Sequence, residues 1–226
     1  MVSGGILLKK LISLTARNTS SLVIDRLCDL SREEDLAVAF LYCDFQAQEE
    51  QETTNLMGAI LKQLLGRGDV PKDIREAFQA AQHEVGRGPL PADLMRMLRI
   101  IIASLPPVFI CIDALDECLP KYLPEILESL RKIVQESPRT RIFLTGRPHV
   151  GEIIQRYFPE SVTIPIVPNQ DDIRNYLEMR LDRDYEPEAM NDALRADITR
   201  IIVDKMSDTC VGVSLYQRCI LTNYWV

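Results

Sequence analysis

The chain has 226 residues, of which 46% are hydrophobic and 26% charged, a composition that is typical of a folded globular protein and excludes a disordered or fibrous one. Its 26 Lys and Arg against 33 Asp and Glu give a formal net charge of −7, which argues against nucleic acid or an anionic membrane surface as the main partner. The length allows one large α/β domain, or such a domain with part of a second.

The six cysteines indicate a reducing compartment. They lie mostly within apolar runs and form no CxxC pair, so neither a zinc module nor a disulfide scaffold is indicated. The longest apolar stretch, 100–112, is interrupted by Ser104 and two prolines and is shorter than the ~20 residues of a membrane span. The apolar stretch 6–14 carries Lys9 and Lys10, unlike the core of a secretory signal. We therefore expect a cytoplasmic protein that does not cross a membrane.

The first hundred residues predict helices around one strand. Apolar residues recur at helical spacing in 22–30, whereas 37–45 is a short and nearly continuous apolar run of strand character. The acidic run 49–52 is expected to be a solvated loop. Three helices are expected next. The first is capped by Thr53 or Thr54 and ends at Gly66, the second starts at Pro71, and the third starts at Pro91.

The middle of the chain predicts strands buried on both faces of a parallel sheet. Residues 108–113 and 141–146 are unbroken apolar runs, and a helical stripe at 126–134 connects them. A further strand is expected at 162–167, and only helices beyond it, at about 170–182 and 190–206. The alternation of strands and helices before residue 168 predicts a doubly wound α/β sheet.

The stretch VFICIDALDEC places three acids at a strand's carboxyl end. Asp113 ends the predicted strand, and Asp116 and Glu117 follow it. Open α/β sheets place their sites at such strand ends, where one carboxylate can hold Mg²⁺ and a second acid can polarise a water molecule that attacks a γ-phosphate. The alternative is that the acids cap the following helix, whose dipole favours negative charge.

The stretch FLTGRPH ends another predicted strand with an arginine. Arg147 is expected at the same sheet edge as Asp113, where its planar guanidinium can reach a γ-phosphate. The alternative is a solvated arginine in a Gly-Arg-Pro turn.

Together these motifs resemble those of a known family. IDALDE followed by FLTGRP looks like the Walker B and sensor 1 motifs of NACHT-type NTPases, most closely the nephrocystin-like group common in fungal ankyrin- or WD-repeat proteins. SSLVIDRL, FLYCDFQ, ILKQLL and PNQDDIRNYLEMRL also look like that group, so the resemblance covers about residues 20–212.

The resemblance implies a P-loop NTPase-like parallel sheet flanked by helices, followed by a partial helical domain. It implies a switch in the STAND class that binds ATP or GTP with Mg²⁺, is closed with ADP, and opens and oligomerises with ATP. Asp113 matches the metal carboxylate, Asp116 and Glu117 match the catalytic acidic pair, and Arg147 matches the sensor. Gly212 resembles the start of the glycine motif that closes the helical domain over the nucleotide.

The phosphate loop of that family is missing. The motif G-x-x-x-x-G-K-[ST] wraps the β-phosphate in backbone amides and supplies a lysine and a hydroxyl, yet no glycine in this chain is followed by lysine. The family's sheet order implies a vacancy between the strands at 141–145 and 162–167, which part of 5–14 is expected to fill. The tail LYQRCILTNYWV also stops resembling the family after Gly212, so the C-terminus is atypical as well. Truncation, a misread exon boundary or decay would each produce these two unusual ends.

We therefore expect three regions and weigh two functions. The regions are an atypical N-terminus at 1–20, a NACHT-like core at 21–167 and a partial helical domain at 168–226. The first function is a nucleotide-binding signalling switch, truncated or degraded, with weak or no binding and hydrolysis. The second is a catalytically dead interaction module, and an active ATPase or kinase is disfavoured because it needs the missing loop. The resemblance implies protein partners through flanking or repeat domains, and a homo-oligomer.

Overall fold

A computed structural model describes residues 19–66, 70–85, 90–166, 170–182, 191–208 and 217–221. The helices are α2 (Thr19–Glu33), α3 (Thr53–Leu65), α4 (Lys72–Val85), α5 (Pro91–Ser104), α6 (Leu123–Glu136), α7 (Gly151–Tyr157), α8 (Gln170–Leu181) and α9 (Asp192–Asp208). The strands are β1 (Ala37–Tyr42), β2 (Val108–Asp113), β3 (Thr140–Gly146), β4 (Val162–Ile166) and β5 (Gln217–Leu221). Three short 3-10 helices, η1 (Phe45–Glu50), η2 (Leu115–Glu117) and η3 (Pro148–Val150), lie in the connections.

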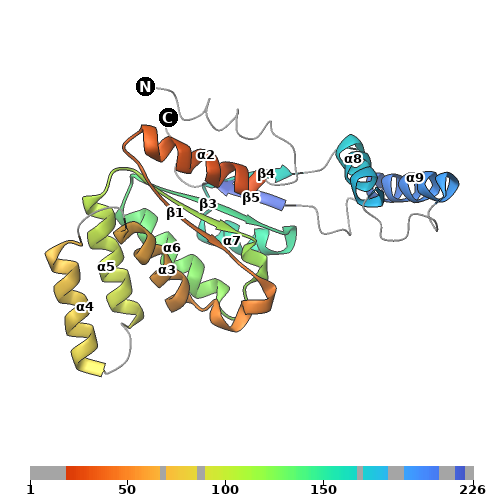
Figure 1. Ribbon diagram of the computed structural model, residues 1–226. Coiled ribbons are helices and arrows are strands. Elements are labelled where there is room, and N and C mark those ends of the chain that lie inside the picture. The colour runs from red at the N-terminus through yellow and green to blue at the C-terminus, as the bar shows by residue number, and fades with distance from the viewer. Residues whose placement is uncertain are drawn as a thin grey trace.

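The strands form one sheet in the order β1-β2-β3-β5-β4 (Figure 1). β1, β2 and β3 pair in parallel, in a register that places Tyr42 opposite Asp113. β5 pairs antiparallel with both β3 and β4, so β4 points in the same direction as the first three strands. The predicted α/β fold with a parallel sheet flanked by helices is therefore confirmed.

Two apolar layers cover the sheet, one on each face. Along β2, Ile110 and Ile112 face the layer formed with α3, α5 and α6, whereas Cys111 between them faces α2. The same alternation holds in β3, where Leu144 faces the first layer and Phe143 the second. Burial on both faces explains why these strands are continuous apolar runs rather than alternating ones. Figure 1 shows α2 on one side of the sheet and α3, α5 and α6 on the other.

The gap between β3 and β4 is present, but the strand that fills it is not the expected one. The segment 217–221 lies there as β5, and residues 5–14, which were expected to fill it, lie outside the described residues. The expectation of helices alone beyond residue 168 is therefore wrong. Without a strand between them, β3 and β4 would each leave backbone N–H and C=O groups unpaired. A segment of modest apolar character can therefore become a strand there, because it pairs with both edges.

Most predicted element boundaries hold to within a few residues. α3 differs in detail, because Glu52 occupies its N-cap position without a side-chain bond and the buried Thr53 is its first residue. The acidic run at 49–52 is only partly a solvated loop, since Gln51 is 7% exposed. No helix among the described ranges is long and apolar enough to span a bilayer.

Candidate functional site

The backbone turns sharply where β2 ends at Asp113. Ala114 adopts a left-handed conformation with φ of 55°, which is uncommon for a residue with a side chain. The fully buried Leu115 anchors the η2 turn that follows. The Cys43 N–H donates to the Asp113 carbonyl at 3.0 Å, so the end of β1 holds the start of this turn. The turn directs the next two acids back toward β3.

Thr145 holds the Asp113 carboxylate. Its hydroxyl donates to Asp113 Oδ1 and accepts the Ala114 N–H at 3.0 Å. The Thr145 side chain is fully buried, whereas Asp113 is half-buried. No hydrogen bond from the described residues reaches Asp113 Oδ2, so one carboxylate oxygen remains available at the edge of the sheet. Sequence analysis did not single out Thr145, although a polar residue within an apolar strand is a signal that was present.

Arg147 lies between the two acids of the turn. Its backbone N–H donates to Asp116 Oδ1 at 3.0 Å, and its Nε lies 3.3 Å from Asp116 Oδ2. Its Nη2 donates to Glu117 Oε1 at 2.8 Å. The Asp116 side chain is only 3% exposed, and its Oδ2 makes a charge contact without a hydrogen bond of normal geometry. The guanidinium therefore compensates a carboxylate that has lost most of its water.

The four residues that the sequence singled out are brought together. Asp113, Asp116, Glu117 and Arg147 lie at the carboxyl edge of β2 and β3, as expected for neighbouring parallel strands. The alternative that the acids cap the next helix is wrong, because α6 begins only at Leu123 and its N-cap residue is Tyr122. The alternative of a solvated arginine holds in part, since the Arg147 side chain is 45% exposed but is paired with both acids. The chemical roles of these residues stay predictions.

Gly146 permits this close approach. A Cβ built on it would lie 2.9 Å from Val150 Cγ2 and 3.3 Å from Asp116 Oδ1. Both contacts are tighter than normal packing distances. A side chain at residue 146 would therefore push apart the β3 end and the acidic turn.

A second layer of contacts joins the segment after β1 to the acidic turn. Gln48 Nε2 donates to the Glu117 carbonyl at 2.8 Å, and Lys121 Nζ lies 3.3 Å from Glu49 Oε2. The thiols of Cys43 and Cys118 are 3.3 Å apart. Their sulfur–sulfur hydrogen bond, followed by burial, raises the pKa of Cys43, and the same bond lowers the pKa of Cys118. The sequence carried no signal for these long-range contacts.

Asp113 could contribute one carboxylate ligand to a metal ion at this edge of the sheet. Within the described ranges, no group of three His, Cys, Asp or Glu side chains could hold a metal ion. Arg147 engages Asp116 and Oε1 of Glu117, whereas no described residue bonds Asp113 Oδ2 or Glu117 Oε2. One carboxylate matches the usual Mg²⁺ arrangement in which phosphates and waters supply the other ligands.

The strand beside β3 reaches this edge in the reverse direction. Arg218 of β5 is registered with Gly146, and Leu221 with Phe143 at the far end of the pairing. β5 therefore begins at the edge that carries Asp113 and ends toward the opposite edge. The carboxyl end of β5 therefore points away from Asp113, unlike that of a parallel strand in the same position.

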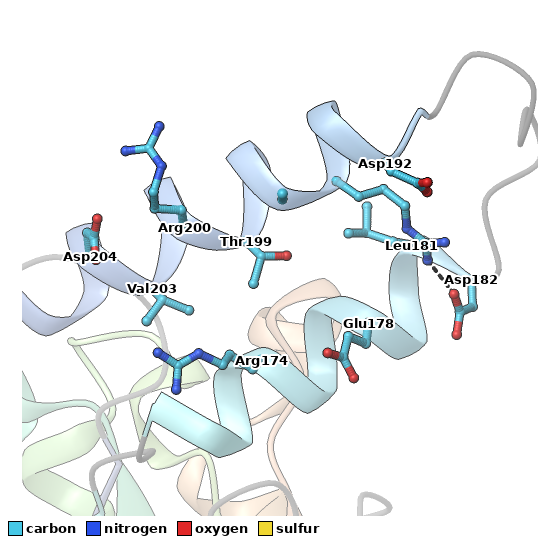
Figure 2. A pocket seen from close by; sticks show the side chains of 11 residues that line it. Arg174, Glu178, Leu181, Asp182, Asp192, Thr199, Arg200, Val203 and Asp204 are labelled. Atoms are coloured by element: carbon cyan, nitrogen blue, oxygen red, sulfur yellow. Dashed lines mark hydrogen bonds and ion pairs between the residues drawn. The ribbon is translucent and has the colours of Figure 1, made fainter.

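A charged hollow of about 650 Å³ lies between α8 and α9, and none of the predicted site residues line it (Figure 2). Arg195 of α9 bonds Asp182 of α8 at one end of it. Arg174 and Arg200 also line it, and each is paired with an aspartate one turn away on its own helix. Small-molecule sites are mostly apolar with a few polar groups, so this lining does not favour one.

Comparison with known proteins places the site within a family. No curated protein matches the chain. The family model described as nephrocystin 3, N-terminal, matches residues 18–147, which run from the start of α2 through the acidic turn to Arg147. The match covers more than half of the chain and includes all four residues of the site, and the chain therefore belongs to the nephrocystin 3 N-terminal family.

Proposed function

We propose that the chain is a signalling module of the NACHT/STAND type whose nucleotide site retains its acidic half and binds nucleotide weakly, with negligible hydrolysis. The observation that carries this proposal is that Asp113, held by Thr145, and Arg147, paired with Asp116 and Glu117, lie at the same carboxyl edge of the parallel strands. Ligands of open α/β sheets bind at this edge. The proposed setting is the cytoplasm.

Each residue has a proposed part in binding. Asp113 Oδ2 would hold Mg²⁺ that is also bound by the nucleotide phosphates, and the ion would neutralise their charge. Arg147 would contact the γ-phosphate, which requires its Nη2 to leave Glu117. ATP and GTP both fit this chemistry, because it addresses phosphates rather than the base.

The same geometry argues for negligible hydrolysis. Asp116 is one of the two acids expected to polarise an attacking water molecule, but its side chain is only 3% exposed and stays bonded to the backbone N–H of Arg147. A general base must reach the water molecule that it activates. No glycine in this sequence is followed by lysine, so we do not expect the charge-assisted hydrogen bonds of a phosphate loop.

The position of β5 supports the alternative function, an interaction module that binds no nucleotide. β5 occupies the place beside β3 in the antiparallel direction, so the edge receives no phosphate loop from that strand. In this alternative the acids and Arg147 serve only to hold the β2 and β3 ends together. Both functions imply protein partners, and the switch also implies nucleotide-dependent oligomers that light scattering would detect.

Titrations of Mg-ATP, Mg-GTP and Mg-ADP separate the two functions. The switch predicts saturable binding that Asp113→Asn abolishes, with the matched variant Asp35→Asn unchanged, because Asp35 precedes β1 at the opposite edge. It also predicts that Arg147→Ala weakens Mg-ATP and leaves Mg-ADP nearly unaffected. Absence of binding at millimolar nucleotide, or equal binding by wild type and Asp113→Asn, would refute the switch.

A further inference from the structure

Two thiols face each other beneath the acidic turn. Cys43 directly follows β1, and Cys118 directly follows η2, so the pair spans two segments that are 75 residues apart in the chain. Their sulfurs are 3.3 Å apart, and the residues are 8% and 1% exposed. A disulfide has a sulfur–sulfur distance of about 2.05 Å, so the sulfurs would have to approach by little more than an ångström.

The surrounding contacts hold the two segments in this position. The Cys43 N–H donates to the Asp113 carbonyl at 3.0 Å, and Gln48 Nε2 donates to the Glu117 carbonyl at 2.8 Å. Gln51 Oε1 lies 3.9 Å from the Cys118 sulfur and accepts the Asp44 N–H. Bond formation between groups that are already held together loses little freedom, which favours this pair over thiols that must first meet.

Two further cysteines whose side chains the structure describes, Cys28 and Cys111, lie elsewhere. Cys111 faces α2 from β2 and is fully buried, and Cys28 packs against that second apolar layer. Cys43 and Cys118 belong to the layer on the opposite face of the sheet. The sheet therefore separates the two sets of thiols.

We propose that Cys43 and Cys118 are an oxidation site that forms a reversible intramolecular disulfide with an oxidant of the peroxide class. One sulfur attacks a peroxide oxygen, the O–O bond breaks, and a sulfenic acid and water form. The second sulfur then attacks the first, the S–O bond breaks, the S–S bond forms and a second water leaves. Two thiols thus lose two protons and two electrons in total, and one hydrogen peroxide is reduced to two waters.

The bond would join the end of β1 to the turn that carries Asp116 and Glu117. Oxidation would therefore act on the acidic turn directly, through the residue that follows Glu117. This inference does not rest on nucleotide binding, because the reaction and its detection involve only the two thiols.

The test treats the folded wild-type protein with hydrogen peroxide, removes the oxidant, and alkylates the remaining thiols in denaturant. The expected product has two alkyl groups fewer than the reduced protein and regains both after dithiothreitol. Digestion with trypsin and Asp-N should yield a linked peptide pair that contains Cys43 and Cys118. Asp-N is needed because the tryptic peptide 100–121 carries both Cys111 and Cys118.

Variants provide the matched controls. Cys111→Ala should still form the link, whereas Cys43→Ala and Cys118→Ala should each lose it. Full alkylation of Cys43 and Cys118 after peroxide, or their conversion to sulfinic acids without a link, would overturn the proposal. A link that forms only after unfolding in urea would overturn it as well, since the folded arrangement is what brings the sulfurs together.

Discussion

Replacement of Arg147 by alanine should destabilise the fold as well as alter the site. The substitution removes both ion pairs and leaves Asp116, whose side chain is 3% exposed in the wild type, with the backbone N–H of residue 147 as its one partner among the described residues. Loss of one partner from a fully buried pair costs about 3–5 kcal/mol, and from an exposed pair below about 1 kcal/mol. Arg147 itself is 45% exposed, so water replaces part of what is lost. We expect a decrease of about 1–3 kcal/mol in the free energy of unfolding.

Urea unfolding followed by circular dichroism measures this decrease, and a thermal scan should show a midpoint lower by roughly 3–10 °C. Arg156→Ala, at an exposed arginine of α7, is the matched control and should change stability by less than about 0.5 kcal/mol. Adding Asp116→Asn to Arg147→Ala should recover part of the loss, because the unpaired charge is then absent. Equal unfolding midpoints for Arg147→Ala and wild type would refute the conclusion that Arg147 compensates a buried carboxylate.

Three further substitutions test how the site is built. Thr145→Val should lower the free energy of unfolding in urea by about 1–3 kcal/mol, because Asp113 and the Ala114 N–H both lose their partner. The control Thr163→Val on β4 should lower it less, and equal decreases would contradict the bridging role of Thr145. Gly146→Ala should destabilise the fold by about 1–3 kcal/mol, because the new Cβ would press against Val150 and Asp116. Gly58→Ala within α3, where a Cβ meets nothing within 4 Å, should instead stabilise it by about 0.5–1 kcal/mol, and stability changes of the same sign would refute the packing argument. Ile220→Pro should remove a hydrogen bond between β5 and a neighbouring strand, and it should accelerate amide hydrogen exchange in both β3 and β4. The control is Ile220→Val, and equal exchange rates in the two variants would show that β5 does not hold these strands.

The sequence predicted the parallel strands and the convergence of the site residues, for a physical reason. Strands buried on both faces are unbroken apolar runs, so 108–113 and 141–146 could be found without knowledge of their neighbours. Parallel neighbours bring their carboxyl ends to one edge, which is why Asp113 and Arg147 lie at the same edge of the sheet and Arg147 reaches Asp116. The strands depend on their local composition, and the meeting of their carboxyl ends depends on the connection between β2 and β3 through α6.

What the sequence did not predict depends on contacts between distant segments. β5 is a short run whose strand character depends on the open edges of β3 and β4. The burial of Gln51 depends on bonds to the backbone of Asp44, and the Cys43 and Cys118 pairing joins two separate connections. The apolar pattern of a sequence does not indicate which distant residues will become hydrogen-bond or strand partners. Thr145 is an intermediate case, because its polarity was visible but its partner was not.

Weak binding of Mg-ATP through Asp113 is the central claim, and a ligand-observed NMR titration of wild type and Asp113→Asn tests it most directly. Removal of a phosphate-binding lysine and its amide cradle deletes several hydrogen bonds worth roughly 1.5–3 kcal/mol each, and a loss of about 4 kcal/mol is close to a thousandfold in affinity. The account predicts a Kd above about 100 μM for wild type and no saturable binding for Asp113→Asn. Micromolar binding by wild type, or binding that persists in Asp113→Asn, would contradict it.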